Sequence, residues 1–140
     1  IIFMDMDSKG LLKNWIDALQ AWDVERVVAC YAVDAVNFQI ATGKPAVGIE
    51  QIANDTREFF NGFPDAWSRV DNLISDGNRA AWEWVGGGTF AGEFYGNQPT
   101  GKTFEIHGCG FFTFQDGLIV FQQGYWDKLS WFTQVGLPIE

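Results

Sequence analysis

Two titratable side chains near the end of the sequence could move protons at neutral pH. Asp127 follows Tyr125 and Trp126 at the end of an alternating, strand-like segment, and Trp131 comes shortly after it. Apolar surroundings disfavour the charged form of a carboxyl group, so they raise its pKa towards the range in which it can act as both acid and base. The sequence therefore predicts Asp127 at the wall of an apolar pocket.

The second candidate is His107, the only histidine in the chain. A histidine can serve as an acid or a base in catalysis, although a histidine held by structural hydrogen bonds fits the sequence equally well. Asp127 also has an alternative role, because an aspartate before a short helix over residues 128–135 would act as its N-cap. One histidine is too few for a histidine-rich metal site. Both side chains are therefore predicted catalytic residues with a structural alternative.

The spacing of apolar residues predicts helices in the first half of the chain and strands in the second. Ser8 is the expected N-cap of a first helix, Asp23 caps a shorter second helix, and residues 49–63 suit a third. Gly86–Gly88 predicts a bend or bulge within a long strand. The predicted strands cover residues 34–40, 67–75, 79–94, 103–114 and 118–127. Helices followed by antiparallel strands indicate an α+β fold, in which a curved sheet packs on the N-terminal helices around a pocket.

The turn between the last two strands decides which side chains share a face. A three-residue loop over Gln115–Gly117 would pair Phe114 with Leu118. That register places on one face, as the predicted pocket wall, His107, Cys109, Phe111, Phe121, Gln123, Tyr125 and Asp127. A two-residue loop would shift the register by one and move His107 to the other face. The other face is equally apolar, so the sequence leaves open which face is concave, and the outer one is a predicted dimer interface.

Aromatic residues are frequent, with seven Trp and thirteen Phe among 140 residues. They could form an aromatic core with an apolar oligomer face, or they could line a cavity for a flat apolar ligand. A chain of this length indicates one domain, which we expect to cover residues 1–140. Four further side chains are candidates for the pocket wall, each with a core role as the alternative: Trp15, Tyr31, Asn37 and Trp84.

The chain carries a formal net charge of -9. Phosphate binding needs clustered Lys and Arg, so neither nucleic acid nor an anionic membrane is an expected partner. The first residues lack the basic segment and long apolar run of a signal peptide, and no run approaches the roughly 18 apolar residues that span a membrane. Cys30 and Cys109 are too few for a disulfide framework. We therefore expect a cytoplasmic protein whose partner is a small apolar molecule.

Five segments in chain order resemble the SnoaL-like polyketide cyclase family, within the nuclear-transport-factor-2-like superfamily. They are Trp82–Trp84, Gly88–Phe94, Pro99–Lys102, Phe114–Ile119 and Tyr125–Asp127. The resemblance implies a cone-shaped fold, a homodimer and chemistry without a cofactor. In such cyclases an aspartate near the end of the last long strand is the acid/base of an intramolecular aldol ring closure. The resemblance therefore implies this role for Asp127 and a pocket role for His107.

The sequence features described above are compatible with three functions. The first is a cyclase, a lyase or isomerase-like enzyme that acts on a polycyclic aromatic or similarly apolar substrate. The second is a carrier or sensor that binds an aromatic or steroid-like ligand without chemistry. The third, a cone-fold hydrolase or ketosteroid isomerase, is disfavoured because an epoxide hydrolase needs an arginine between two carboxylates. None of the four arginines has a suitable strand position: Arg26, Arg57, Arg69 and Arg79.

Overall fold

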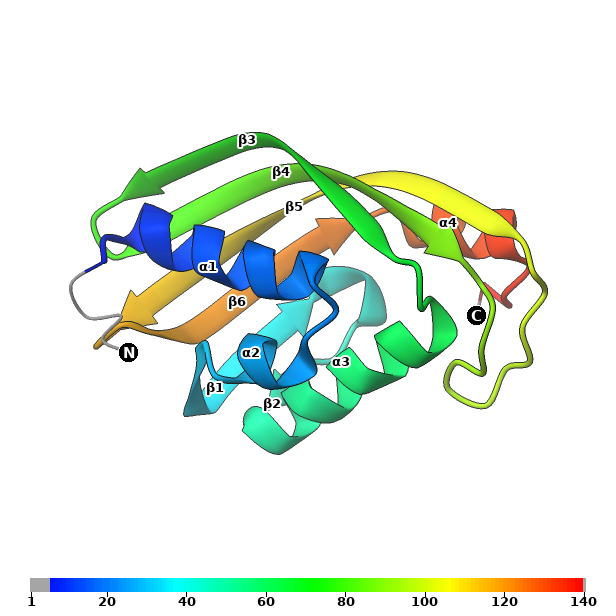
Figure 1. Ribbon diagram of the computed structural model, residues 1–140, viewed down its shortest axis with the longest axis horizontal. Helices are drawn as coiled ribbons and strands as arrows, with labels where there is room; N and C mark the ends of the chain where they lie inside the picture. Colours follow the sequence, from blue (N-terminus) through cyan, green and yellow to red (C-terminus); the bar gives the residue numbers. More distant parts are fainter. Residues whose placement is uncertain (1–5, 140) are drawn as a thin grey trace.

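The computed structural model describes residues 6–139. A curved six-stranded sheet arches over α1, α2 and α3, and α4 lies at one end of the sheet (Figure 1). The helices are α1 (Ser8–Gln20), α2 (Val24–Val28), α3 (Ile49–Gly62) and α4 (Lys128–Val135), with a 3-10 helix η2 (Ile40–Thr42). The strands are β1 (Tyr31–Gln39), β2 (Ala46–Val47), β3 (Trp67–Asp76), β4 (Arg79–Thr89), β5 (Thr103–Gln115) and β6 (Leu118–Trp126). The predicted α+β class with a curved sheet on N-terminal helices is confirmed.

The sheet runs in the order β2-β1-β6-β5-β4-β3. β1 lies parallel to β6, with Asn37 opposite Gln122, and the other strand pairs are antiparallel. The expected antiparallel arrangement is wrong for this one pair. The alternation of apolar and polar residues identifies a strand but does not show which strand lies next to it. The parallel pairing brings side chains of β1 next to those of β6 on one surface of the sheet.

Aspartate side chains cap the starts of α1 and α2. Asp7 accepts a hydrogen bond from the backbone N–H of Gly10 at 2.8 Å, and Asp23 caps α2 in the same way at 3.2 Å. The predicted cap at Asp23 is confirmed, whereas the first cap lies one residue before the predicted Ser8. The Ser8 hydroxyl instead donates to the carbonyl oxygen of Arg79 at 3.0 Å and ties α1 to the sheet.

β5 and β6 are joined by a two-residue turn, Asp116–Gly117, with positive φ values of 53° and 79°. The expected three-residue loop is therefore wrong. The two-residue turn shifts the register by one, and Val120, an extra residue on β6, shifts it by one more in the same direction. The total shift of two residues changes the pairing partners but keeps each side chain on its expected face. As a result Phe111 pairs with Gln123, and these two side chains share a face as the sequence predicted.

Burial decides which face of this hairpin is concave. Phe111, Phe121 and Tyr125 are 42%, 37% and 41% exposed, so the predicted pocket wall is the convex surface of the sheet. The opposite face carries buried side chains, among them Phe104, Ile106, Phe112 and Phe114. The concave surface, which α1–α3 cover, is therefore the face that the sequence left as the alternative (Figure 1).

β4 passes through Gly86–Gly88 without a bulge, because its pairing with β5 is continuous along the whole strand. The predicted bulge is wrong here, and the irregularity lies on β3 between Val70 and Asn72. A side chain at Gly87 would overlap the carbonyl oxygen of Phe104 on β5. Glycine is needed at this position because the neighbouring backbone approaches closely.

The buried side chains form two clusters. The first joins α1 to the sheet around Trp15 and Phe112, whose ring centroids lie 4.9 Å apart. The second is aromatic and surrounds Phe63, which is fully buried and lies 5.3 Å from the ring of Trp131. Trp84 packs against both clusters. Much of the aromatic content thus belongs to the core, and one Trp stands where the two clusters meet.

Candidate functional site

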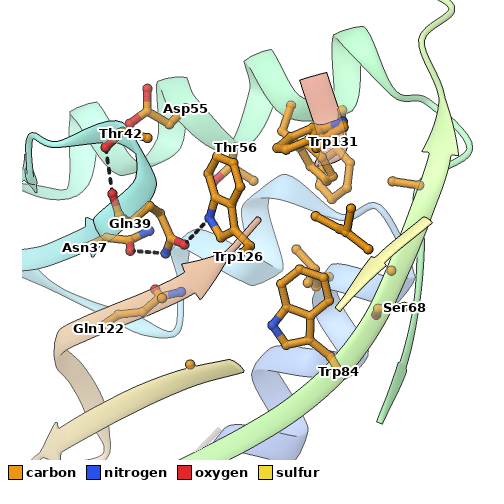
Figure 2. A pocket seen from close by; sticks show the side chains of 18 of the residues that line it. Asn37, Gln39, Thr42, Asp55, Thr56, Ser68, Trp84, Gln122, Trp126 and Trp131 are labelled. Carbon is orange, nitrogen blue, oxygen red and sulfur yellow. Dashed lines mark hydrogen bonds between the residues drawn. The ribbon is translucent and has the colours of Figure 1, made fainter. Parts of the chain in front are cut away.

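A cavity of about 600 Å³ lies between the concave face of the sheet and the helices. Its wall includes rings from both clusters, among them Trp15, Trp84, Phe104 and Trp131. Figure 2 shows Trp84, Trp126 and Trp131 with a group of amide side chains from β1 and β6. A cavity of this size with aromatic walls and a few polar groups is typical of a site for a small, largely apolar molecule.

Glycines form the floor of this cavity. Gly110 on β5 pairs directly with Gly124 on β6, and both lie on the cavity wall. A Cβ atom at Gly124 would overlap the side chain of Gln39, and one at Gly108 would overlap the ring of Trp84. The missing side chains therefore create room, and they allow Gln39 and Trp84 to lie across the neighbouring strands.

A chain of hydrogen bonds leads from α1 to β6 beneath the cavity. The indole N–H of Trp15 donates to the hydroxyl of Tyr31 at 3.1 Å, and this hydroxyl donates to Oε1 of Gln122. Burial raises the pKa of Tyr31 well above its ordinary value, so the hydroxyl keeps its proton throughout the physiological range. Since an indole can only donate, the tyrosine proton must point to Gln122.

A second chain of hydrogen bonds runs along the same wall (Figure 2). The indole N–H of Trp126 donates to Oε1 of Gln39 at 2.9 Å, and Nε2 of Gln39 donates to Oδ1 of Asn37 at 2.7 Å. The hydroxyl of Thr42 donates to the backbone carbonyl of Gln39 at 2.8 Å. These bonds fix the amide orientations, because each oxygen is placed against a donor.

The charged residues on the wall are Lys44, Asp55 and Lys128. Asp55, on α3, accepts a hydrogen bond from the hydroxyl of Tyr95 at 2.7 Å. Burial raises the pKa of Tyr95, and the bond to Asp55 raises it further, so this hydroxyl remains a donor. Among the residues that the structure describes, Asp55 is the only carboxylate on the wall. The arrangement thus offers one carboxylate and two lysines beside uncharged hydrogen-bonding groups.

The model of the SnoaL-like polyketide cyclase family matches residues 9–135. This chain belongs to that family. No curated protein sequence matches it. The family match spans every residue that lines the cavity, so the resemblance seen in the sequence is confirmed.

Solved structures with the same fold come from several bacteria. A protein assigned as a SnoaL-like polyketide cyclase, from Jannaschia sp., is 20% identical with a TM-score of 0.83, and the match covers 96% of each chain. IdmH from Streptomyces antibioticus, assigned as a polyketide cyclase, is 25% identical with a TM-score of 0.76 over 93% of this chain and 99% of its own. A protein from Catenulispora acidiphila with a ketosteroid isomerase-like fold, solved with trimethylamine, is 21% identical with a TM-score of 0.77 over 92% and 94%. These likenesses confirm the predicted cone-shaped, nuclear-transport-factor-2-like fold.

The structure brings four of the predicted site residues of this family member to the cavity. Trp15, Tyr31, Asn37 and Trp84 all lie on its wall. Their contact with a ligand stays a prediction. Gln39, Asp55 and Gln122 lie on the same wall and were missed by the sequence reasoning. Asp55 carried a usable signal, because it stands between Ile52 and Phe59 at helical spacing on the apolar side of α3.

Of the predicted wall on the β5–β6 hairpin, Cys109 lies on the cavity wall and the other residues lie outside it. Phe111, Phe121, Gln123 and Tyr125 are on the convex face, so the expectation that they line the pocket is wrong. His107 is exposed to solvent and is not on the cavity wall either. The physical reason is that both faces of the hairpin are apolar, and only the packing of α1–α3 on one of them distinguishes the two.

Asp127 is exposed and does not point into the cavity, contrary to the expectation from the sequence. Its side chain is the N-cap of α4 and accepts a hydrogen bond from the backbone N–H of Ser130 at 3.0 Å. The cap is the alternative that the sequence left open for this residue. β6 ends at Trp126, so Asp127 already belongs to the start of the helix rather than to the inner face of the strand.

Replacing Asp127 tests this assignment. We expect Asp127→Ala to lower the free energy of unfolding by about 1 kcal/mol, the usual cost of losing an N-cap. Ligand affinity should remain unchanged, since the side chain does not line the cavity. Urea melts and ligand titrations on the same variant provide both values. Unchanged stability combined with lost ligand binding would place Asp127 in the site after all.

Residues 6–139 also bear on two other kinds of site. No helix in this range is long and apolar enough to cross a membrane. Within the same range, no group of three His, Cys, Asp or Glu side chains lies close enough together to hold a metal ion.

Proposed function

We propose that this protein is a cofactor-independent cyclase that closes a ring in a flat, largely apolar carbonyl compound by intramolecular aldol addition. The observation that carries the proposal is the cavity of about 600 Å³ with aromatic walls and a single carboxylate, Asp55, on the part of the wall that the structure describes. Membership of the cyclase family over residues 9–135 supports the same class of reaction.

In this proposal Asp55 is the acid/base. Its carboxylate takes a proton from a carbon next to a carbonyl group, and the electron pair of that C–H bond forms an enolate. The enolate carbon attacks a second carbonyl carbon of the same molecule and forms one C–C bond, and the new alkoxide takes the proton back from Asp55. Nothing is oxidised and no group leaves, so the product is an isomer of the substrate.

The test is a turnover assay with aromatic compounds that carry a 1,3-dicarbonyl side chain beside a third carbonyl group, which accepts the enolate carbon. We expect a product of unchanged mass that contains one new ring, formed faster with protein than in buffer. Compounds that bind in the cavity but are released unchanged would favour the second candidate function, a carrier for the same ligands. One observation favours that alternative: the hydrogen-bonding groups of Tyr31, Asn37 and Gln122 are all uncharged.

The homodimer predicted from the sequence is a further part of the proposal. The convex face of the sheet exposes Phe111, Phe121 and Tyr125, and the rings of Phe111 and Tyr125 pack at 90° with centroids 6.2 Å apart. An apolar face of this kind, opposite the cavity, suits a second copy of the chain.

Sedimentation of the wild type and of Phe111→Glu tests the dimer. We expect a wild-type dimer at micromolar concentration, and a dimer dissociation constant at least about tenfold higher in the variant, since a buried Phe contributes about 1.5–3 kcal/mol. Ligand affinity serves as the control and should not change, because Phe111 does not line the cavity. A wild-type monomer at this concentration would overturn the interface.

A further inference from the structure

The connection between β4 and β5 makes a tight turn beside α3. Phe94 and Asn97 exchange two backbone hydrogen bonds at 3.0 and 2.9 Å, and the residues between them, Tyr95 and Gly96, have φ values of 46° and 81°. A two-residue turn with both φ values positive is of type I′, which favours asparagine, aspartate or glycine. Tyrosine is strained in the first of these positions, and strain of this kind gathers at residues with a function.

Two carboxylates of α3 hold Tyr95 in this conformation. Its backbone N–H donates to Oε1 of Glu58 at 2.5 Å, and its hydroxyl donates to Oδ1 of Asp55 at 2.7 Å. Hydrogen bonds to charged acceptors are stronger than those between neutral groups. The two bonds fix both ends of the residue against α3, so the hydroxyl reaches the carboxylate on the cavity wall.

Phe94 anchors the turn, whereas the ring of Tyr95 is open to solvent. Phe94 is 8% exposed and packs closely on Gly62, where an added Cβ would lie only 2.8 Å from that of Phe94. Tyr95 is 57% exposed, and its ring meets the ring of Phe94 edge-on with centroids 4.8 Å apart. The tyrosine ring can therefore turn outwards about its side-chain bonds while the backbone stays in place. The hydrogen bond to Asp55 opposes this movement.

Tyr95 stands where the cavity wall meets the solvent. It lines the cavity although more than half of it is exposed, so its ring separates the cavity from the solvent at this point. Gln51, another exposed residue of the wall, lies one turn before Asp55 on α3. The wall also reaches the surface between α1 and β3, where Nε2 of Gln20 donates to the carbonyl oxygen of Ser68 at 3.0 Å. Figure 2 shows Asp55 and Ser68 on opposite sides of the cavity.

We propose that Tyr95 is a gate, closed by its hydrogen bond to Asp55, and that a ligand enters and leaves the cavity when the tyrosine ring turns out into solvent. The gate goes beyond the proposed reaction, because a carrier needs an entry as much as an enzyme does. It rests on the proposed function only in that the cavity binds a flat aromatic ligand.

A gate changes the rates of binding and release but leaves the affinity unchanged. When the bond to Asp55 holds the tyrosine ring in both the free and the liganded protein, the association and dissociation rate constants are both scaled by the open fraction. A direct contact between Tyr95 and the ligand acts differently, since its loss raises the dissociation rate constant and Kd together. The two rate constants therefore distinguish a gate from a ligand contact.

Stopped-flow mixing with 9-fluorenone, a flat three-ring ketone, measures both rate constants through the quenching of Trp fluorescence. The slope and the intercept of the observed rate against ligand concentration give the association and dissociation rate constants. Tyr95→Phe keeps the ring and removes the hydroxyl. We expect both constants to rise about fivefold in this variant, the equilibrium factor of one net hydrogen bond, with Kd within about twofold of wild type.

Two further variants locate the effect. Asp55→Ala breaks the same hydrogen bond from α3 and should also raise both rate constants. The double variant with Tyr95→Phe should be no faster than the faster single variant, because both changes remove one shared interaction. Tyr125→Phe is the control, since it removes a tyrosine hydroxyl on the convex face, outside the cavity. It should bind and release 9-fluorenone at wild-type rates.

Each outcome has a defined meaning. Parallel increases of both rate constants in Tyr95→Phe and Asp55→Ala, absent from Tyr125→Phe, support the gate. Unchanged rates in Tyr95→Phe, or a rise in the dissociation rate constant alone, overturn the gate and leave the proposed reaction standing. Faster exchange in Gln20→Met but not in Tyr95→Phe places the entry between α1 and β3 and overturns the gate as well. If 9-fluorenone does not bind, the gate and the proposed ligand class both fall, whereas gated exchange without ring closure overturns only the reaction.

Discussion

Asp55→Asn should reduce the rate of ring closure at least about 10²-fold, the usual contribution of a positioned general acid or base. The asparagine keeps an oxygen that can accept the hydroxyl proton of Tyr95, so the local hydrogen bond survives while the proton-accepting carboxylate is lost. Ligand affinity should stay within about threefold of wild type, because the change is nearly isosteric.

A matched control for this experiment stands one turn further along α3. Glu58 accepts a hydrogen bond from the backbone N–H of Tyr95 but does not lie on the cavity wall. Glu58→Gln should therefore leave the rate of ring closure close to wild type. Equal losses in Asp55→Asn and Glu58→Gln would indicate that both act through the position of Tyr95. A full rate in Asp55→Asn would remove Asp55 as the acid/base.

Gly108→Ala should both destabilise the protein and weaken ligand binding. A Cβ at this position would overlap the rigid indole of Trp84, so the ring has to leave its place across β5. Forced repacking of this kind typically costs about 1–3 kcal/mol. Because Trp84 forms part of the cavity wall, the affinity for a flat aromatic compound such as 9-fluorenone should fall at least about fivefold.

Gly110→Ala is the matched control, two residues further along β5; Gly110 lies on the cavity wall, whereas Gly108 lies beneath the ring of Trp84. Its Cβ would meet the indole nitrogen of Trp82 at 3.3 Å, a close contact that a small movement relieves. Alanine is also favoured over glycine within a strand by about 0.5–1 kcal/mol, which offsets this contact. Thermal melts and equilibrium dialysis should show a larger loss of stability and of ligand affinity in Gly108→Ala than in Gly110→Ala. Similar losses in the two variants would show that any added side chain on this strand, rather than the displacement of Trp84, causes them.

The order of helices and strands could be predicted because the spacing of apolar residues along each element follows directly from which of its sides is buried. α1, α3 and the β5–β6 hairpin all lie close to their predicted ranges. The neighbours of each strand could not be predicted in the same way. The parallel contact of β1 with β6 depends on how the whole chain folds back, and no local pattern encodes it.

The candidate site was only partly predictable for a related reason. Phe111 and Phe112 are both aromatic, and only the helices that cover Phe112 make its side the concave one. Since the wrong face was taken as the wall, Gln122 was overlooked although it adjoins the chosen Gln123. The resemblance to the family implies a pocket position for Asp127. In this structure β6 ends one residue before it, and Asp127 is the N-cap of α4.

A crystal structure of the protein with bound 9-fluorenone tests the account most directly. We predict that the three rings of the ligand lie between Trp84 and the other aromatic residues of the cavity. A ligand on the convex face, beside His107 and Tyr125, would contradict the account.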